Sequence, residues 1–118
     1  MTETSTVGRQ QLILDPEEIA SEPRQMLQPG VDYTMLWRED RSVAGLMFIA
    51  PGASMAEHTH SAATHHIWVV AGAAHVEGRT LRAGSYWHVP VGVPHAVEAA
   101  RPDGCTLFYL YLRQPTST

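Results

Sequence analysis

Apolar and polar residues alternate along most of this chain in short runs, which Gly, Pro and Asp residues interrupt. Short runs with a period of two residues predict β-strands, and closely spaced strands indicate a barrel or a sandwich. The pattern predicts strands at residues 32–38, 43–50, 54–60, 65–70, 73–77, 80–81, 86–89, 95–99 and 105–112. Strands do not alternate with long helices, so we expect an all-β domain and not a parallel α/β fold.

One short helix is expected ahead of the strands. Asp15 is a good N-cap, Pro16 suits the first helical position, and two glutamates follow where the helix dipole favours negative charge. Pro23 limits this helix to one or two turns. Residues 1–11 are rich in Thr, Ser and Gln and are expected to form a flexible tail, which leaves residues 12–118 as a single domain.

The composition excludes several classes of function. The formal net charge is −4, which argues against nucleic acid or an anionic membrane as a partner. All eight basic residues are Arg, so Schiff-base chemistry on a lysine is excluded. Cys105 is the single cysteine and lies in an apolar run, where a buried core thiol is expected. With no signal-peptide pattern and no long apolar segment, we expect a cytoplasmic protein.

All seven histidines lie between residues 58 and 95, which makes this window the expected place of the chemistry. His58 and His60 are two residues apart, so their side chains share one face of a strand. His65 begins the next predicted strand, and its neighbour His66 faces away unless the register slips by one residue. His95 follows a turn rich in Pro and Gly, and an adjacent antiparallel strand brings it back to the same point. Neutral imidazole binds divalent Fe, Mn, Ni, Cu and Zn, so the pattern indicates one divalent transition metal.

This spacing resembles the two sequence motifs of the cupin superfamily, G-x5-H-x-H-x3,4-E-x6-G and G-x5-P-x-G-x2-H-x3-N. Residues 52–72 match the first motif and residues 84–99 match the second, both without an insertion; the matching positions are Gly52, His58, His60, His65 and Gly72, then Gly84, Pro90, Gly92 and His95. The resemblance implies a double-stranded β-helix, or jelly-roll, barrel that follows the short N-terminal helical turn. The chain has no internal repeat, so a single barrel is expected.

Two positions depart from the cupin motifs. His65 stands where the family usually has Glu, and Ala99 stands where the second motif ends in Asn. The resemblance therefore implies a four-histidine variant of the metal site, with His58, His60, His65 and His95 as ligands. Exchange of a carboxylate for an imidazole removes one negative charge, which makes the bound metal a stronger Lewis acid.

A finer resemblance points to several functions. Residues 28–31, 36–40, 83–86 and 104–108 resemble small cupins of the anti-sigma-factor type and cupin dioxygenases that cleave diketones or hydroxyacetophenones. The four-histidine site is also similar to that of a zinc-binding polyketide cyclase. We expect an enzyme that acts on a small dicarbonyl, enol or phenolic compound, with dioxygenase-type C–C cleavage favoured. The alternatives are a zinc-type cyclase or isomerase and a non-catalytic, metal-dependent sensor or binding module.

Other side chains in the histidine window are weaker candidates. Tyr86 and His88 share one face of their strand and either line the cavity as proton donors or pack outward in a dimer contact. His75 is expected to be a solvated strand residue. A homodimer is expected from the cupin resemblance, with residues 32–38 as the strand that pairs with the partner. The apolar strand at 106–112 would be an edge liability if nothing covered it.

Overall fold

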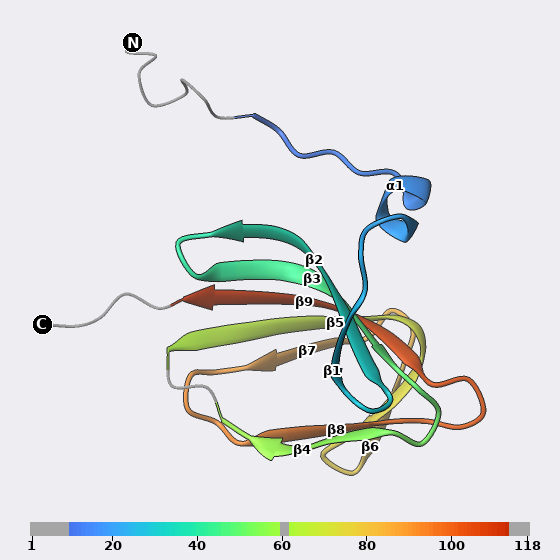
Figure 1. Cartoon of the computed structure of the whole chain (residues 1–118). Coiled ribbons are helices and arrows are strands. Elements are labelled where there is room, and N and C mark those ends of the chain that lie inside the picture. The colour runs from blue at the N-terminus through green and yellow to red at the C-terminus, as the bar shows by residue number, and fades with distance from the viewer. Residues whose placement is uncertain (1–9, 60–61, 114–118) are drawn as a thin grey trace, which may run out of the picture.

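The computed structural model describes residues 10–59 and 62–113, and it places one helix and nine strands in them (Figure 1). These elements are α1 (Pro16–Ala20), β1 (Gln25–Gln28), β2 (Val31–Glu39), β3 (Ser42–Ile49), β4 (Ser54–His58), β5 (Ala63–Val76), β6 (Arg79–Arg82), β7 (Tyr86–Val89), β8 (His95–Ala99) and β9 (Cys105–Arg113). The expected all-β architecture with a short N-terminal helix is confirmed. In this described part of the chain, no helix has the length and apolar character that crossing a membrane requires.

Helix α1 begins where the sequence predicts it. The Asp15 side chain accepts a hydrogen bond from the Glu18 backbone N–H at 2.8 Å, and the Glu18 carboxylate accepts one from the Asp15 N–H at 2.9 Å. This reciprocal capping box satisfies two backbone donors that the first helical turn would otherwise leave without partners.

The strands form one antiparallel sheet that curls into a half-barrel (Figure 1). Its larger part has the order β1-β2-β3-β9-β5, with β7 also paired to β5. The second half of β5 pairs with β6 and β8, and β8 pairs with β4. Strand β5 therefore belongs to both walls of the half-barrel.

Strand β5 is continuous where the sequence pattern predicts two strands, at 65–70 and 73–77. The pairing with β9 shifts by one residue between Val69 and Ala71, which is a β-bulge, and Gly72 follows with φ +71°. A Cβ atom at Gly72 would collide with the carbonyl oxygen of Gly104. From the sequence, Gly72 is expected to end a strand. In the structure it lies at the bend where β5 passes from one wall to the other.

The pairing corrects two expectations about edges. Strand β1, which the pattern did not predict, pairs with β2 around the turn at Pro29 and Gly30, so β2 is covered on both sides within the chain. Residues 25–28 contain no β-branched side chain, which explains why they do not resemble a strand. Strand β9 lies between β3 and β5, so it is a central strand and not an exposed edge.

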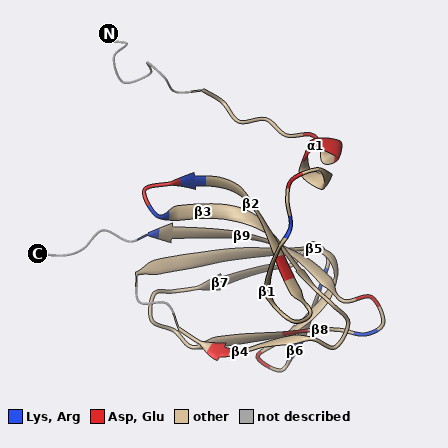
Figure 2. Ribbon diagram, viewed as in Figure 1, with Lys and Arg blue, Asp and Glu red and all other residues tan. Residues whose placement is uncertain are grey.

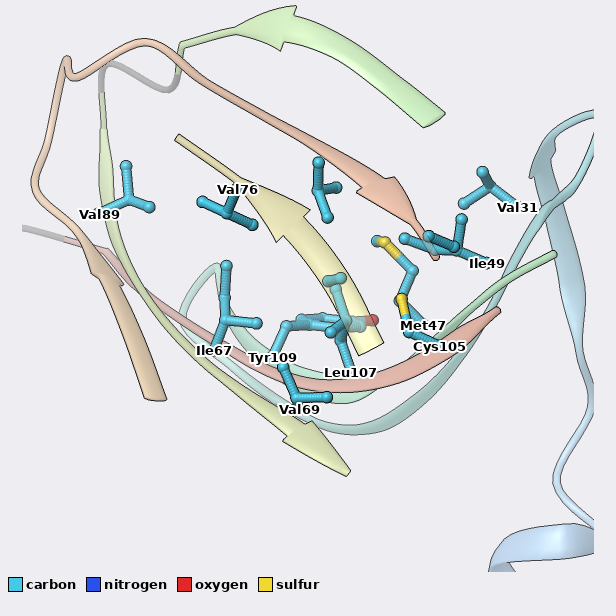
Figure 3. Close-up of a cluster of buried hydrophobic side chains, with 13 residues drawn as sticks. Val31, Met47, Ile49, Ile67, Val69, Val76, Val89, Cys105, Leu107 and Tyr109 are labelled. Carbon is cyan, nitrogen blue, oxygen red and sulfur yellow. The ribbon is translucent and has the colours of Figure 1, made fainter. Parts of the chain in front are cut away.

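Alternate side chains of the strands meet between the two walls and form the core (Figure 3). The core includes Val31, Met47, Ile49, Ile67, Val69, Val76, Val89, Val97, Leu107 and Tyr109. The prediction for Cys105 is confirmed, since it is only 5% exposed. Burial raises the pKa of its thiol to about 11, so the thiolate nucleophile does not form near neutral pH.

Candidate metal centre

Three histidines from three different strands meet at one end of the half-barrel. His58 ends β4, His95 begins β8, and the antiparallel register pairs these two residues directly. Their ring centroids lie 4.1 Å apart, and the ring of His65, from β5, lies 5.2 Å from that of His95. Two imidazoles on one metal, at about 2.0–2.1 Å from it, have centroids roughly 4.5–5 Å apart. The His58–His95 spacing is somewhat shorter than this and the His65–His95 spacing somewhat longer, so the rings are neighbours but are not in the arrangement of a shared ion.

Burial keeps the imidazole of His95 in the form that binds a metal. His65 is 1% exposed and His95 is 6% exposed. Burial lowers the pKa of His95; the Val93 carbonyl opposes this shift, and the nearby His58 adds to it. His95 is therefore neutral at neutral pH, and a neutral imidazole has a nitrogen lone pair to offer a metal.

Backbone carbonyls fix which nitrogen of two rings carries the proton. Nδ1 of His58 lies 2.9 Å from the carbonyl oxygen of Ala56, and Nδ1 of His95 lies 3.2 Å from that of Val93. A carbonyl oxygen only accepts, so Nδ1 must donate and Nε2 must carry the lone pair. Metal-binding histidines commonly donate their other ring N–H to a carbonyl in this way, so the donor set fits a divalent metal.

The third histidine is held by an aromatic side chain that the sequence analysis did not identify. The ring of Tyr111, opposite His65 on β9, stacks on the His65 ring with 3.7 Å between centroids and 14° between planes. Burial raises the pKa of Tyr111, and neighbouring Tyr109 adds to the effect, so the phenol stays neutral. Period-two alternation on β9 places Tyr109 and Tyr111 on the inner face, and the register with β5, which the sequence does not specify, places Tyr111 against His65.

An apolar cavity of about 350 Å³ opens beside His58. Among the described residues its lining is Leu27, Tyr33, Val43, Met47, Met55, His58, Tyr109 and Tyr111, with no Asp, Glu, Lys or Arg. A second, much smaller hole of about 20 Å³ adjoins His58 and His95, which is room for about one water-sized atom. The cavity can therefore take a small, largely uncharged ligand close to the histidines.

Not every candidate residue lies at this site. His60 lies outside the described residues, and within residues 10–59 and 62–113 no three His, Cys, Asp or Glu side chains converge closely enough to form a metal site on their own. The four-ligand set therefore stays a prediction. Tyr86 and His88 lie with His66 on the outer face of the sheet, so the structure does not bring them to His65 and His95. His75 is exposed and contacts Thr80.

Another cavity, of about 480 Å³, lies on the outer face of the sheet. Its lining includes Asp32, Phe48 and Thr106, which are paired across β2, β3 and β9 and alternate with the inward-facing residues. The guanidinium of Arg24 lies 3.5 Å from the centre of the Phe48 ring in this cavity. None of the described histidines lines it, so its size does not make it the metal centre.

The curled antiparallel sheet defines a cupin barrel, with His58 of the first motif and His95 of the second motif at one end. The chain belongs to the ChrR cupin-like domain family, whose sequence model matches residues 9–113. The expected cupin fold is thus confirmed. A comparison with curated protein sequences gave no significant match.

Several solved structures share this fold. KdgF from Halomonas sp. aligns with a TM-score of 0.71 and 24% identity over 80% of this chain and 90% of its own. An RmlC-like cupin from Shewanella frigidimarina NCIMB 400 aligns with a TM-score of 0.71 and 24% identity over 80% and 86%. The complex of SigE with the anti-sigma ChrR from Rhodobacter sphaeroides contains a chain that aligns with a TM-score of 0.70 and 22% identity over 90% of this chain and 54% of its own. At these identities the likeness shows the fold alone.

Proposed function

We propose that this cupin holds one divalent transition metal with His58, His60, His65 and His95 and acts on a small dicarbonyl, enol or phenolic compound. The observation that carries the proposal is that the His95 ring lies next to the rings of both His58 and His65, and that His58 and His95 donate Nδ1–H to backbone carbonyls. His60 completes the set from the sequence, because it is two residues beyond His58 in the first motif.

The chain and the metal make different contributions to the reaction. A divalent metal bound there supplies Lewis-acid polarisation of a carbonyl or enol oxygen, and iron also supplies the oxygen activation that dioxygenase-type C–C cleavage needs. The chain itself contributes position and a dry environment. The carbonyls of Ala56 and Val93 orient two imidazoles, and Tyr111 packs against the third.

The cavity beside His58 supports a small substrate with little charge. A dianion would lose its hydration there without meeting a cationic side chain, because the described part of the chain places no Lys or Arg in the walls. Tyr33, Tyr109 and Tyr111 offer ring faces and edges to a flat ligand. The Tyr33 hydroxyl donates to the Gln25 side chain at 2.8 Å, which fixes this ring at the cavity wall.

The test begins with the metal content of protein purified without oxygen, measured for the wild type, His65→Ala and His75→Ala. His75 is a matched control because it is an exposed histidine on the same strand. We expect stoichiometric metal in the wild type and in His75→Ala, and loss of metal in His65→Ala. Oxygen uptake on addition of acetylacetone to an iron-containing protein would support C–C cleavage, and tightly bound zinc would favour a cyclase or isomerase. Absence of metal even after reconstitution would contradict the proposal.

A non-catalytic, metal-dependent sensor is the second candidate. The family match to the ChrR cupin-like domain favours it, together with the fold shared with a chain of the SigE–ChrR complex. A sensor would bind small dicarbonyl or phenolic compounds without turnover and would pass the signal to a protein partner. Ligand binding without product, followed by mass spectrometry over hours, would select this candidate over the enzyme.

The proposal includes a homodimer in a reducing compartment such as the cytoplasm. Strand β1 pairs only with β2 in the described residues, and Met26 and Leu27 on it are 71% and 50% exposed. An exposed apolar edge strand is a site for pairing with another chain, and a second copy would cover it. The single cysteine is buried, which suits a compartment where disulfides do not form.

A further inference from the structure

His66 and His88 form a pair of imidazoles on the outer face of the sheet. The register of β5 with β7 places them directly opposite each other, and their rings lie 4.8 Å apart at 14°. Their neighbours His65 and Val89 are buried on the inner face, because successive strand residues point to opposite sides. The pair is therefore separated from the candidate metal centre by the thickness of the sheet.

A hydrogen bond anchors each ring through one nitrogen. Thr64 Oγ1 donates its proton to the carbonyl of Val89 at 3.2 Å, so it must accept from Nε2–H of His88, which lies 2.9 Å away. Nδ1 of His88 therefore carries the lone pair. Nδ1 of His66 lies 2.7 Å from the Tyr86 hydroxyl, which leaves Nε2 as the nitrogen outside this bond. Both histidines are reachable, since His88 is exposed and His66 is partly so.

We propose that His66 and His88 form a second metal site on the outer face, which takes a borderline divalent ion such as Cu(II), Ni(II) or Zn(II). The centroid spacing of 4.8 Å lies within the roughly 4.5–5 Å expected for two imidazoles on one ion. In the structure the two rings are stacked, so binding of an ion requires them to turn about their terminal side-chain torsions until the lone pairs converge, and the exposure of His88 permits this. The Tyr86 hydroxyl bonds Nδ1 and so lies away from the Nε2 side of the His66 ring; water completes the coordination.

The electrostatic setting selects among metals. Neither β5 nor β7 carries an Asp, Glu, Lys or Arg residue (Figure 2). Without a carboxylate the site disfavours Mg(II) and Ca(II), which need oxygen ligands. Imidazole pairs follow the order in which Cu(II) binds most tightly, so Cu(II) is the most sensitive probe. This second site goes beyond the proposed function and does not depend on it.

Two tryptophans distinguish the outer site from the inner one. The Trp68 ring lies 6.4 Å from that of His66, whereas the Trp87 ring lies 5.9 Å from that of His95. Paramagnetic Cu(II) broadens the NMR signals of nearby protons. In a titration with Cu(II), ion at the outer site broadens the Trp68 indole N–H signal first, and ion at the inner site broadens that of Trp87 first.

The titration is made in a His65→Ala background, which weakens the inner site, and in the wild type. We expect one Cu(II) to remain bound in His65→Ala with Trp68 broadened, and this binding to disappear when His66→Ala or His88→Ala is added. His75→Ala is the matched control, and we expect this variant to keep the bound Cu(II). Broadening of the Trp68 signal that survives both His66→Ala and His88→Ala, or Cu(II) binding that leaves Trp68 sharp, overturns the second site. Loss of the inner site alone, seen at Trp87, bears on the proposed function and leaves the outer site standing.

Discussion

Tyr111 and His65 lie face to face on adjacent strands, with 3.7 Å between their ring centroids. Stacking over that distance restricts the rotation of the imidazole about its terminal torsion, which is otherwise broad. His65 is 1% exposed, and it lines neither of the two cavities beside His58. Tyr111 lines both, so its ring forms the wall between the ligand space and the buried histidine.

Loss of the Tyr111 ring should therefore weaken metal binding. We expect Tyr111→Leu to lower the affinity for zinc by about 10–100-fold, the usual effect of removing a group that orients a ligand. Tyr111→Phe keeps the stacked ring and should retain the affinity of the wild type. Competition with a chromophoric zinc chelator measures both variants, and circular dichroism checks that they fold. Equal losses in Leu and Phe would show that the hydroxyl, and not the stacked ring, is what matters.

Gly72 should tolerate substitution far less well than Gly78. Both residues have positive φ, at +71° and +74°, so either Ala substitution incurs the strain of a left-handed backbone, about 1–2 kcal/mol. A Cβ at Gly72 also meets the Gly104 carbonyl, whereas nothing lies within 4 Å of a Cβ at Gly78. We expect the larger drop in melting temperature for Gly72→Ala, measured by thermal unfolding beside Gly78→Ala. Equal drops would mean that the β5 bend can relax.

Cys105 should be protected in the native protein. Burial raises its pKa from 9.0 to about 11, so the thiolate fraction at pH 8 is lower than that of an exposed cysteine by about 100-fold. Alkylation by iodoacetamide at pH 8 should be at least that much slower in the native state than in urea. Because the folded pKa is the higher one, this group contributes stability below pH 9 that is lost as the pH rises towards 11. Rapid native labelling would contradict the burial of this thiol.

The homodimer gives a prediction at the edge of the sheet. Met26→Lys places a charge on the exposed edge strand β1 and should shift sedimentation from dimer to monomer. Val91→Lys introduces the same charge at another exposed apolar position, in the loop before β8, and serves as the control. A wild type that sediments as a monomer at every concentration would remove the dimer from the proposal.

Most of the strands and the two motif regions could be predicted from the sequence, because alternation and Gly or Pro punctuation report local structure directly. The backbone has positive φ at four glycines of the motifs, Gly52, Gly72, Gly84 and Gly92. The motif spacing therefore reflects where the backbone must adopt this conformation. What could not be predicted depends on contacts between strands. The face of the sheet on which Tyr86 and His88 lie is fixed by the register of β7 with β5. Tyr111 lies against His65 because of the register of β9 with β5. Strand β1 forms because the Pro29–Gly30 turn returns it to β2 and not because its residues favour strands.

The passage of β5 through both walls ties the assembly of the histidines to the order of folding. His65 is at one end of β5, while its other end pairs with β8, the strand that begins with His95. The three histidines are spread along the chain from His58 to His95, which are 37 residues apart. Their rings become neighbours only when both walls of the half-barrel have formed. Contacts of such sequence separation form late, so a bound metal should slow unfolding far more than it speeds folding. Metal release would then report the opening of the barrel itself.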